Sequence, residues 1–300
     1  MFRRSSAALL VPLVLVIAPT PAGAATASAK NVRIVFARLQ ERGPENYEIW
    51  TMDGTGGNQV RLTHNAVADH DPDWSPDGTK IAWVHFETQF NGGGPADVWI
   101  MDADGSNPHR LTHDHADILQ PSWSPDGRRI VFSRDDKIFV INANGTGEHQ
   151  ISQPGEFGFD PAWSPDGSTI VFSHLFPTGG LDLATMRPDG SQLRRLTHTR
   201  AFDEDAEWSP DGQQVAFSGY DSHTGWHVYV VDRDGANPSV LVQLDSSLEP
   251  GWFPDGSRVA FYACVRDCGL YQIRTNGHGL RPLGRIRGFS DIQPDITAAS

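Results

Sequence analysis

The stretch WSPDGSTIVF, residues 163–172, decides the fold because it recurs along the chain. WSPDG occurs four times and the variant WFPDG once, at intervals of 40 to 49 residues. The copies open at Trp74, Trp123, Trp163, Trp208 and Trp252. In each copy Pro fixes φ, Asp suits the next position and Gly accepts a positive φ, so the segment predicts a tight turn between two strands. An apolar strand pattern follows every copy.

A second sequence marker recurs in step with the W-S-P-D-G copies. A glycine ends a polar turn, as in MDADG or VDRDG, and an aliphatic residue stands six positions after it. The glycines are Gly56, Gly105, Gly145, Gly190, Gly235 and Gly277. The two markers predict four short antiparallel strands per repeat. A sheet of this kind cannot bury both faces alone, so the repeats must stack around an axis as blades, with the tryptophans in the wedges between neighbours.

The two ends of the chain supply parts of one further repeat. Residues 32–36, VRIVF, look like a second strand with no first strand ahead of it. Residues 293–296, QPDI, look like a first strand with nothing after it. We therefore expect an all-β fold, a six-bladed β-propeller over residues 31–300, whose C-terminal strand completes the N-terminal blade. Such closure removes exposed sheet edges.

The repeat WSPDGxxIxF, with its D-x-D-G turn and a following Leu-Thr pair, resembles the WD-like repeat of TolB-type β-propellers. It is also similar to the repeats of tricorn protease, the prolyl oligopeptidases and the oligogalacturonate lyases. The resemblance implies the propeller fold and, for the lyases, a metal in the central channel. TolB proteins carry an α/β domain ahead of the propeller. We expect none here, because the repeats begin close to the leader.

Composition excludes several classes of protein. The 30 Gly and 21 Pro would break the long helices of a bundle or coiled coil. Nine Trp and fifteen Phe give more apolar surface than a disordered chain carries. A formal net charge of −13 repels phosphate backbones, which argues against nucleic acid as a partner.

Residues 1–24 have the pattern of a secretory signal. Arg3 and Arg4 precede an apolar run, residues 7–18, and Ala22-Gly23-Ala24 is a cleavage pattern. An uncleaved anchor is the alternative, although the run is shorter than the ~20 residues that span a bilayer. We expect residues 25–30 to be a short linker. The mature protein is then exported, periplasmic or extracellular, soluble and monomeric, with no transmembrane segment.

Two cysteines, Cys264 and Cys268, stand in CVRDC between two strand-like runs. An oxidising compartment permits a disulfide across such a hairpin. A pair of inert thiols is the alternative.

Polar residues recur three positions before the tryptophan column or its C-terminal equivalent. They are Asp71, Gln120, Asp160, Asp205, Glu249 and Gln293. Sixfold closure would gather them at the mouth of the central channel, where carboxylates repel one another unless a cation or a basic group compensates. We predict a ligand site there, with Asp71, Asp160, Asp205 and Glu249 as candidate ligands of a divalent cation. The alternative is a solvated acidic ring that caps local backbone donors.

Two other repeated features suggest ligands less strongly. The D-x-D-G turns resemble calcium loops, but they recur at hairpin positions and lack the distant Glu of an EF-hand. The histidines of the L-T-H triplets, His64, His113 and His198, also recur as part of the repeat. We interpret both features as structural.

No G-x-S-x-G, H-E-x-x-H or P-loop motif occurs, and no catalytic residues can be assigned. Loop lengths vary between strands two and three, and those loops share one face with the connections from strand four to the next blade. The first hypothesis is a non-catalytic module that binds a protein or cell-envelope polymer through this face. The second is a metal-dependent lyase or hydrolase acting on a polysaccharide or small molecule in the channel. The third is a structural subunit of an envelope complex.

Overall fold

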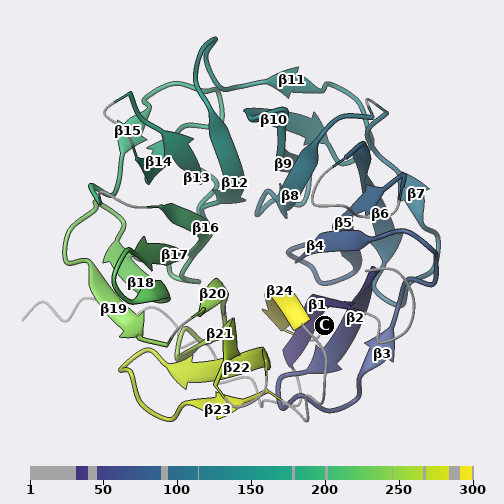
Figure 1. Cartoon of the computed structure of the whole chain (residues 1–300). Coiled ribbons are helices and arrows are strands. Elements are labelled where there is room, and N and C mark those ends of the chain that lie inside the picture. Colours follow the sequence, from purple (N-terminus) through teal and green to yellow (C-terminus); the bar gives the residue numbers. More distant parts are fainter. Residues whose placement is uncertain are drawn as a thin grey trace, which may run out of the picture.

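A computed structural model describes residues 32–39, 46–88, 94–113, 115–177, 180–199, 202–244, 246–265, 268–283 and 291–298. The expected signal peptide and linker, residues 1–24 and 25–30, lie outside these ranges. Six four-stranded antiparallel sheets surround a central axis (Figure 1). The named elements of the described residues are all strands, and none of these residues forms a helix that could cross a bilayer. The expected all-β, six-bladed propeller is confirmed.

Five blades follow the chain, each with its first strand innermost (Figure 1). Blade 1 contains β4 (Asp69–Trp74), β5 (Lys80–Phe86), β6 (Ala96–Asp102) and β7 (His109–Arg110). Blade 2 contains β8 (Ile118–Trp123), β9 (Arg129–Arg134), β10 (Lys137–Asn142) and β11 (His149–Gln150). Blade 3 contains β12 (Gly158–Trp163), β13 (Ile170–Leu175), β14 (Leu181–Met186) and β15 (Arg194–Arg195).

Blade 4 contains β16 (Asp203–Trp208), β17 (Gln214–Asp221), β18 (Gly225–Asp232) and β19 (Ser239–Val242). Blade 5 contains β20 (Leu248–Trp252), β21 (Arg258–Cys264), β22 (Cys268–Arg274) and β23 (Arg281–Pro282). Blade 6 is composite and contains β24 (Asp291–Ala298), β1 (Val32–Leu39), β2 (Tyr47–Asp53) and β3 (Val60–Arg61).

Blade 6 closes the ring by pairing the two ends of the chain. β24 is antiparallel to β1, with Ile34 opposite Ile296 and Val32 opposite Ala298. Figure 1 shows yellow β24 innermost, beside purple β1. Ile34 and Ile296 are buried in one apolar cluster with Phe253 of blade 5. The expected closure by the C-terminal strand is therefore confirmed.

The repeated W-S-P-D-G segment forms the turn between strands one and two. In blade 1 the N–H of Gly78 donates to the carbonyl of Ser75 at 2.7 Å. The Asp77 carboxylate accepts bonds from the Ser75 hydroxyl (2.7 Å) and the Thr79 N–H (3.0 Å). Gly78 has a φ of +65°, which only glycine adopts at little cost. The motif thus carries the turn chemistry that the sequence predicts.

The tryptophan column fills the wedges between blades. Trp123 of blade 2 packs in one buried cluster with Val98 and Ile100 of blade 1 and with Phe132 of its own blade. At the seam between blades 6 and 1, the guanidinium of Arg33 lies 4.4 Å from the Trp74 ring centroid. Burial of these large rings between sheets supplies much of the apolar stabilisation that holds neighbouring blades together.

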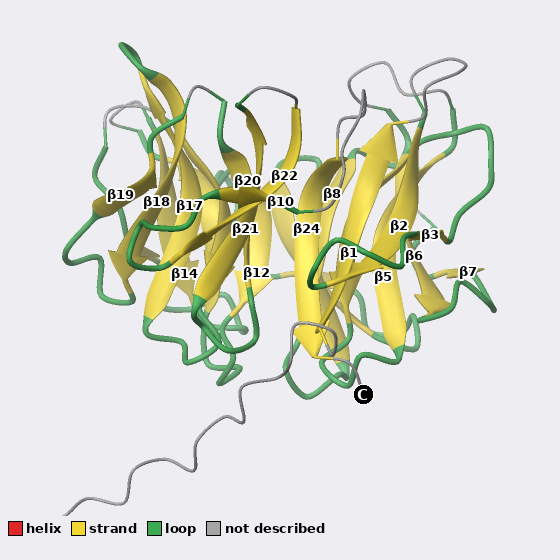
Figure 2. Cartoon of the chain, turned by 90° about the horizontal axis from the view of Figure 1, so that it is seen from below, coloured by secondary structure: helices red, strands yellow, loops and turns green. Residues whose placement is uncertain are grey.

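The strands run between two faces of the propeller, as the view turned by 90° shows (Figure 2). We call the face with the strand two–three and blade-to-blade connections the loop face. The opposite turn face holds the S-P-D-G and D-x-D-G turns. One of these turns closes tightly against its neighbour, because a Cβ on Gly190 would lie 2.0 Å from the carbonyl oxygen of Ile151 in blade 2. Close packing therefore holds this turn of blade 3 against blade 2.

Candidate functional site

Each innermost strand has the same irregularity three residues before its tryptophan position. Pairing with the second strand shifts register there, as between His70 and Asp73 of blade 1. The six residues at this position have φ values between +42° and +55°; they are Asp71, Gln120, Asp160, Asp205, Glu249 and Gln293. Positive φ is uncommon for residues other than glycine, and such bulges re-aim side chains. We call these six residues the first ring.

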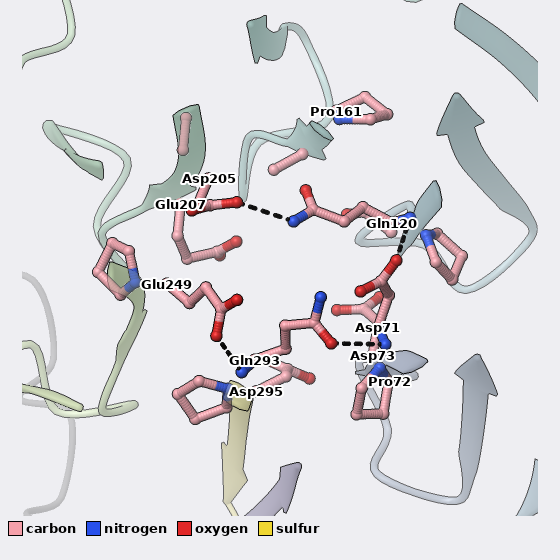
Figure 3. A pocket seen from close by; sticks show the side chains of 16 residues that line it. Asp71, Pro72, Asp73, Gln120, Pro161, Asp205, Glu207, Glu249, Gln293 and Asp295 are labelled. Carbon is pink, nitrogen blue, oxygen red and sulfur yellow. Dashed lines mark hydrogen bonds between the residues drawn. The ribbon is translucent and has the colours of Figure 1, made fainter. Parts of the chain in front are cut away.

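Five members of the first ring line one cavity of about 90 Å³ on the axis: Asp71, Gln120, Asp205, Glu249 and Gln293. Figure 3 shows their side chains reaching toward one another from different blades. Asp160 is not part of this lining, but it interacts electrostatically with Asp205 and Asp71. The structure therefore brings all six predicted residues to the axis and leaves one of them outside the cavity wall.

A second ring of acids lies in the same cavity and was missed by the sequence analysis. Asp73, Glu207 and Asp295 each stand one residue before the tryptophan position, and all three line the cavity. The available signal was the Pro-Asp pair that precedes this position in both blade 1 (Pro72-Asp73) and blade 6 (Pro294-Asp295). Among the described residues, no His, Lys or Arg lines the cavity, and the lining side chains are acidic or neutral.

The ring side chains connect neighbouring blades by hydrogen bonds. The N–H of Gln120 donates to Asp71 Oδ2 (2.9 Å), and the N–H of Gln293 donates to Glu249 Oε2 (2.7 Å). The N–H of Asp71 donates in turn to Gln293 Oε1 (2.9 Å). These bonds are the backbone capping that the sequence analysis offered as the alternative to a ligand site.

Two acids of the second ring, Asp73 and Asp295, do the same further along their strands. Asp295 Oδ2 accepts the N–H of Trp74, and Asp73 Oδ2 accepts the N–H of Trp123, both at 2.6 Å. A carboxylate that accepts backbone N–H groups is favoured in its charged form. The acids therefore have a structural role in joining blades, whether or not they also hold a ligand.

Burial nevertheless opposes ionisation along the tunnel. Burial, with a contribution from the Asp205 charge, raises the pKa of Asp71 to about 7. Burial and the neighbouring Asp295 raise the pKa of Glu207 to about 8. The pKa values of Asp160 and Glu249 are also well above the ordinary range, first because of burial and then because of adjacent carboxylates. The tunnel can therefore hold protons near neutral pH or take up a cation that offsets the repulsion.

The other repeated features lie away from the tunnel cavity. His64, His113 and His198 are exposed and do not line the cavity. The D-x-D-G carboxylates accept bonds within their own turns, as Asp104 does from the N–H and hydroxyl of Ser106. Neither set converges on a shared point in the described residues.

The predicted cysteine pair lies at the tip of the β21–β22 hairpin. Cys264 and Cys268 are opposite each other in the strand register and are joined by a disulfide bond. This hairpin belongs to the loop face.

Comparisons with known proteins agree with this architecture. The family described as TolB beta propeller domain matches residues 89–225. A segment of 60 residues is 35% identical to the Tol-Pal system protein TolB of Hahella chejuensis; it covers 20% of this chain and only 14% of that protein.

Among solved structures, TolB from Acinetobacter baumannii matches with a TM-score of 0.79 at 20% identity, over 90% of this chain and 67% of that one. A chain of a nidogen–laminin complex matches with a TM-score of 0.72 at 10% identity, over 90% of this chain and 99% of that one. At these identities the structural likeness shows the fold alone. Repeat and architecture show that this chain is a six-bladed β-propeller, and over residues 89–225 it is similar to the TolB beta propeller domain.

Proposed function

We propose that this propeller is an exported, non-catalytic scaffold that binds a protein or a cell-envelope polymer through its loop face and tunnel mouth. The observation that carries the proposal is the tunnel wall, where six acids from two rings occur with no basic residue among the described lining residues: Asp71, Asp73, Asp205, Glu207, Glu249 and Asp295. A surface of one charge sign attracts partners of the opposite sign and speeds their encounter.

Exposed aromatic side chains support the choice of face, because the two exposed Phe residues of the described part of the chain lie on the loop face. Phe157 and Phe202 lie in connections between blades on the loop face, and they are 41% and 50% exposed. Leu175 ends β13 at the same face and is 47% exposed. Large apolar side chains next to charged ones are typical of protein-binding surfaces.

Export and compartment follow from the leader, residues 1–24, and remain part of this proposal. The Hahella chejuensis relative is named for a Tol-Pal system. We extend to this chain only a related role in the cell envelope. The matched segment is a small part of that relative, so a Tol-Pal partner is a proposal to be tested.

A divalent cation in the tunnel is proposed as a further component of the site, with Asp71, Asp160, Asp205 and Glu249 as its candidate ligands. Carboxylate oxygens are the ligands that Ca²⁺ and Mg²⁺ prefer. The cavity of about 90 Å³ has room for an ion and a few water molecules.

The alternative function, a metal-dependent lyase or hydrolase, is favoured by one observation. Glu207, with a pKa raised to about 8, is protonated at neutral pH, as a general acid must be. The small volume of the cavity and the lack of a lining His argue against it. Assays with acidic polysaccharides and added Mn²⁺ or Ca²⁺ test this alternative, and turnover that is lost in Glu207→Gln would replace the scaffold proposal.

Site-specific photo-crosslinking tests the scaffold proposal. A photoreactive residue at Phe157 or Leu175 reports on the loop face, and one at Leu193 or Leu280 reports on the turn face. All four side chains are exposed, at 37% to 47%, so the positions are matched for access. We expect crosslinked partners in intact cells from Phe157 and Leu175 only. Equal crosslinking from both faces, or from the turn face alone, would contradict the proposal.

A further inference from the structure

A second cavity, of about 800 Å³, lies along blade 4 beside the last strand of blade 3. Its wall includes the connection from β15 to β16, with Thr197 and Thr199, and the ring faces of Phe217, Tyr220 and Tyr229. It shares no lining residue with the tunnel cavity. We call it the blade 4 pocket.

The pocket is best understood by comparison with the same position in blade 1. There the buried carboxylate of Asp69 lies opposite His85 in the strand register. Asp69 Oδ1 accepts a hydrogen bond from Trp83 Nε1 at 2.9 Å and lies 2.6 Å from His85 Nδ1. The imidazole in turn lies 4.9 Å from the ring of Trp99 on the third strand. Blade 1 thus holds a basic group between a buried acid and an aromatic face.

Other blades place a guanidinium in this position. In blade 6 the guanidinium of Arg38 lies 4.8 Å from the ring centroid of Trp50, and the strand register sets Arg38 opposite Asp291. In blade 2 the guanidinium of Arg134 lies 3.8 Å from the ring of Phe139. Arginine stacked on an aromatic face is a favourable pair, more so when water is excluded.

Blade 4 keeps the acid and the aromatic ring but has no basic side chain at this position. Asp203 is the counterpart of Asp69 and is 1% exposed. The residue opposite it is Gly219, and the counterpart of Trp83 is Phe217, which has no donor. Within the described residues, hydrogen bonds reach Asp203 from two hydroxyls, Thr197 at 2.6 Å and Thr199 at 3.0 Å, and both go to Oδ2.

The lack of a side chain at Gly219 also allows the rings of Tyr229 and Phe217 to lie close to its backbone. A Cβ there would be 2.6 Å from Cδ2 of Tyr229 and 3.4 Å from Cε2 of Phe217. The rings of Phe217 and Tyr229 stack at 5.4 Å with an interplanar angle of 18°. The absence of a side chain therefore leaves a flat aromatic surface next to a buried carboxylate.

We propose that the blade 4 pocket binds a guanidinium group presented by a partner, with Tyr229 beneath the cation and Asp203 as its counter-ion. The rest of the pocket suits the apolar stem that carries such a group. The ring centroids of Phe202 and Tyr220, which both line the pocket, lie 6.2 Å apart, so aromatic surface continues toward the loop face. The nearby Arg195 is already paired with Asp182 at 2.5 Å.

Calorimetric titration with N-acetyl-arginine methylamide tests this proposal, with the neutral citrulline analogue as the matched ligand. We expect the arginine probe to bind at least tenfold more tightly than the citrulline probe. Asp203→Asn should weaken the arginine probe at least tenfold, because it removes the charge but keeps the acceptor for Thr197 and Thr199. Asp104→Asn, which removes one charge from the turn face, should leave binding unchanged.

Two variants of Tyr229 test how much the aromatic ring contributes to binding. Tyr229→Phe keeps the ring face and should bind the arginine probe as the wild type does. Tyr229→Leu should weaken binding several-fold, and circular dichroism checks that it folds. Equal binding of the two probes, no binding of either, or wild-type affinity in Asp203→Asn would overturn the proposal.

Two further arms identify the source of the cation. Agmatine represents a small free cation, and the peptide Gly-Gly-Arg-Gly-Gly represents a protein partner; binding of either supports guanidinium recognition and indicates which source fits. Arg200 precedes Asp203 by three positions and lies outside the described residues. If Arg200→Ala binds the probes and the wild type does not, the pocket serves the chain's own arginine and the proposal fails.

Discussion

The carboxylate of Asp71 accepts a hydrogen bond from the backbone N–H of Gln120, one blade away and 49 positions along the chain, at 2.9 Å. Asp71, which lines the tunnel, thus also joins two blades through this hydrogen bond. The proposed ligand site and the closure of the ring therefore use the same side chains.

Removing the last strand should open the ring. Deletion of residues 292–300 takes away the pairing of β24 with β1 and the Asp295 carboxylate that accepts the Trp74 N–H. We expect the melting temperature to fall by more than about 10 °C, since a change of 1 kcal/mol shifts it by roughly 2–4 °C in a chain of this size. Deletion of residues 299–300 alone is the control. An unchanged melting temperature in the longer deletion would contradict closure by β24.

Stability should fall as the pH rises from 5 to 8. The folded-state pKa values of Asp295, Asp71 and Glu207 are raised, to about 6, 7 and 8, so the folded protein binds more protons than the unfolded chain in this range. Each extra proton lowers the free energy of unfolding by about 1.4 kcal/mol per pH unit, less where tunnel water screens the charge. Urea unfolding at pH 5 and pH 8 measures this slope, and Glu207→Gln should reduce it. A slope of the opposite sign would refute the pKa assignment.

A divalent cation in the tunnel should restore the stability that is lost at higher pH. Calcium, magnesium or manganese at ~100 times its dissociation constant would contribute about 2.7 kcal/mol. Replacing Asp160 and Asp205 together by Asn should abolish the gain in melting temperature and slightly raise the stability without metal. The control is Asp102→Asn with Asp104→Asn, which removes two carboxylates from a turn. Equal gains in both double variants would place the metal elsewhere, and no gain in the wild type would leave the acids as blade connections only.

The exported protein should contain no free thiol. We expect Cys264 and Cys268 to react with a thiol reagent only after reduction, as counted by mass spectrometry. The loop they close is short, so the double Ser variant should lose at most about 2 kcal/mol of stability. Two reactive thiols in unreduced, natively secreted protein would contradict an oxidised pair.

The leader should be removed after Ala24. Mass spectrometry of secreted protein is expected to find Ala25 as the first residue, because Ala22-Gly23-Ala24 fits the cleavage pattern. Cleavage after Ala27 or Ala29 would move the site but keep the export proposal. Protein that keeps Arg3 and Arg4 and stays with the membrane would contradict it.

The repeats predict the fold almost completely, because each marker has a local cause. The Pro and Gly of W-S-P-D-G dictate a turn, and the recurring tryptophan marks the wedge between blades. Closure by β24 could also be predicted from the sequence, since residues 293–296 repeat the pattern before Trp74 without a strand to follow.

The site was less predictable for a physical reason. The positive φ at Asp71 and its five equivalents is imposed by packing at the axis, and nothing in the local preferences of Asp, Glu or Gln requires it. The second ring escaped notice because its position holds Ser122, Ala162 and Gly251 in three of the six blades. The blade 4 pocket depends on the lack of a side chain at Gly219. That lack can be interpreted only when the strand register is known, because the register sets Gly219 opposite Asp203.

The composite blade also sets the order in which the molecule is completed. β1 is made first and its partner β24 is made last, about 260 positions later. Without β24, β1 would have one unpaired edge, and Trp74 would lack the acceptor that Asp295 supplies. Closure of the ring therefore depends on the last of these strands to be synthesised, and a chain cut short before β24 keeps an unpaired strand edge that favours pairing with another copy.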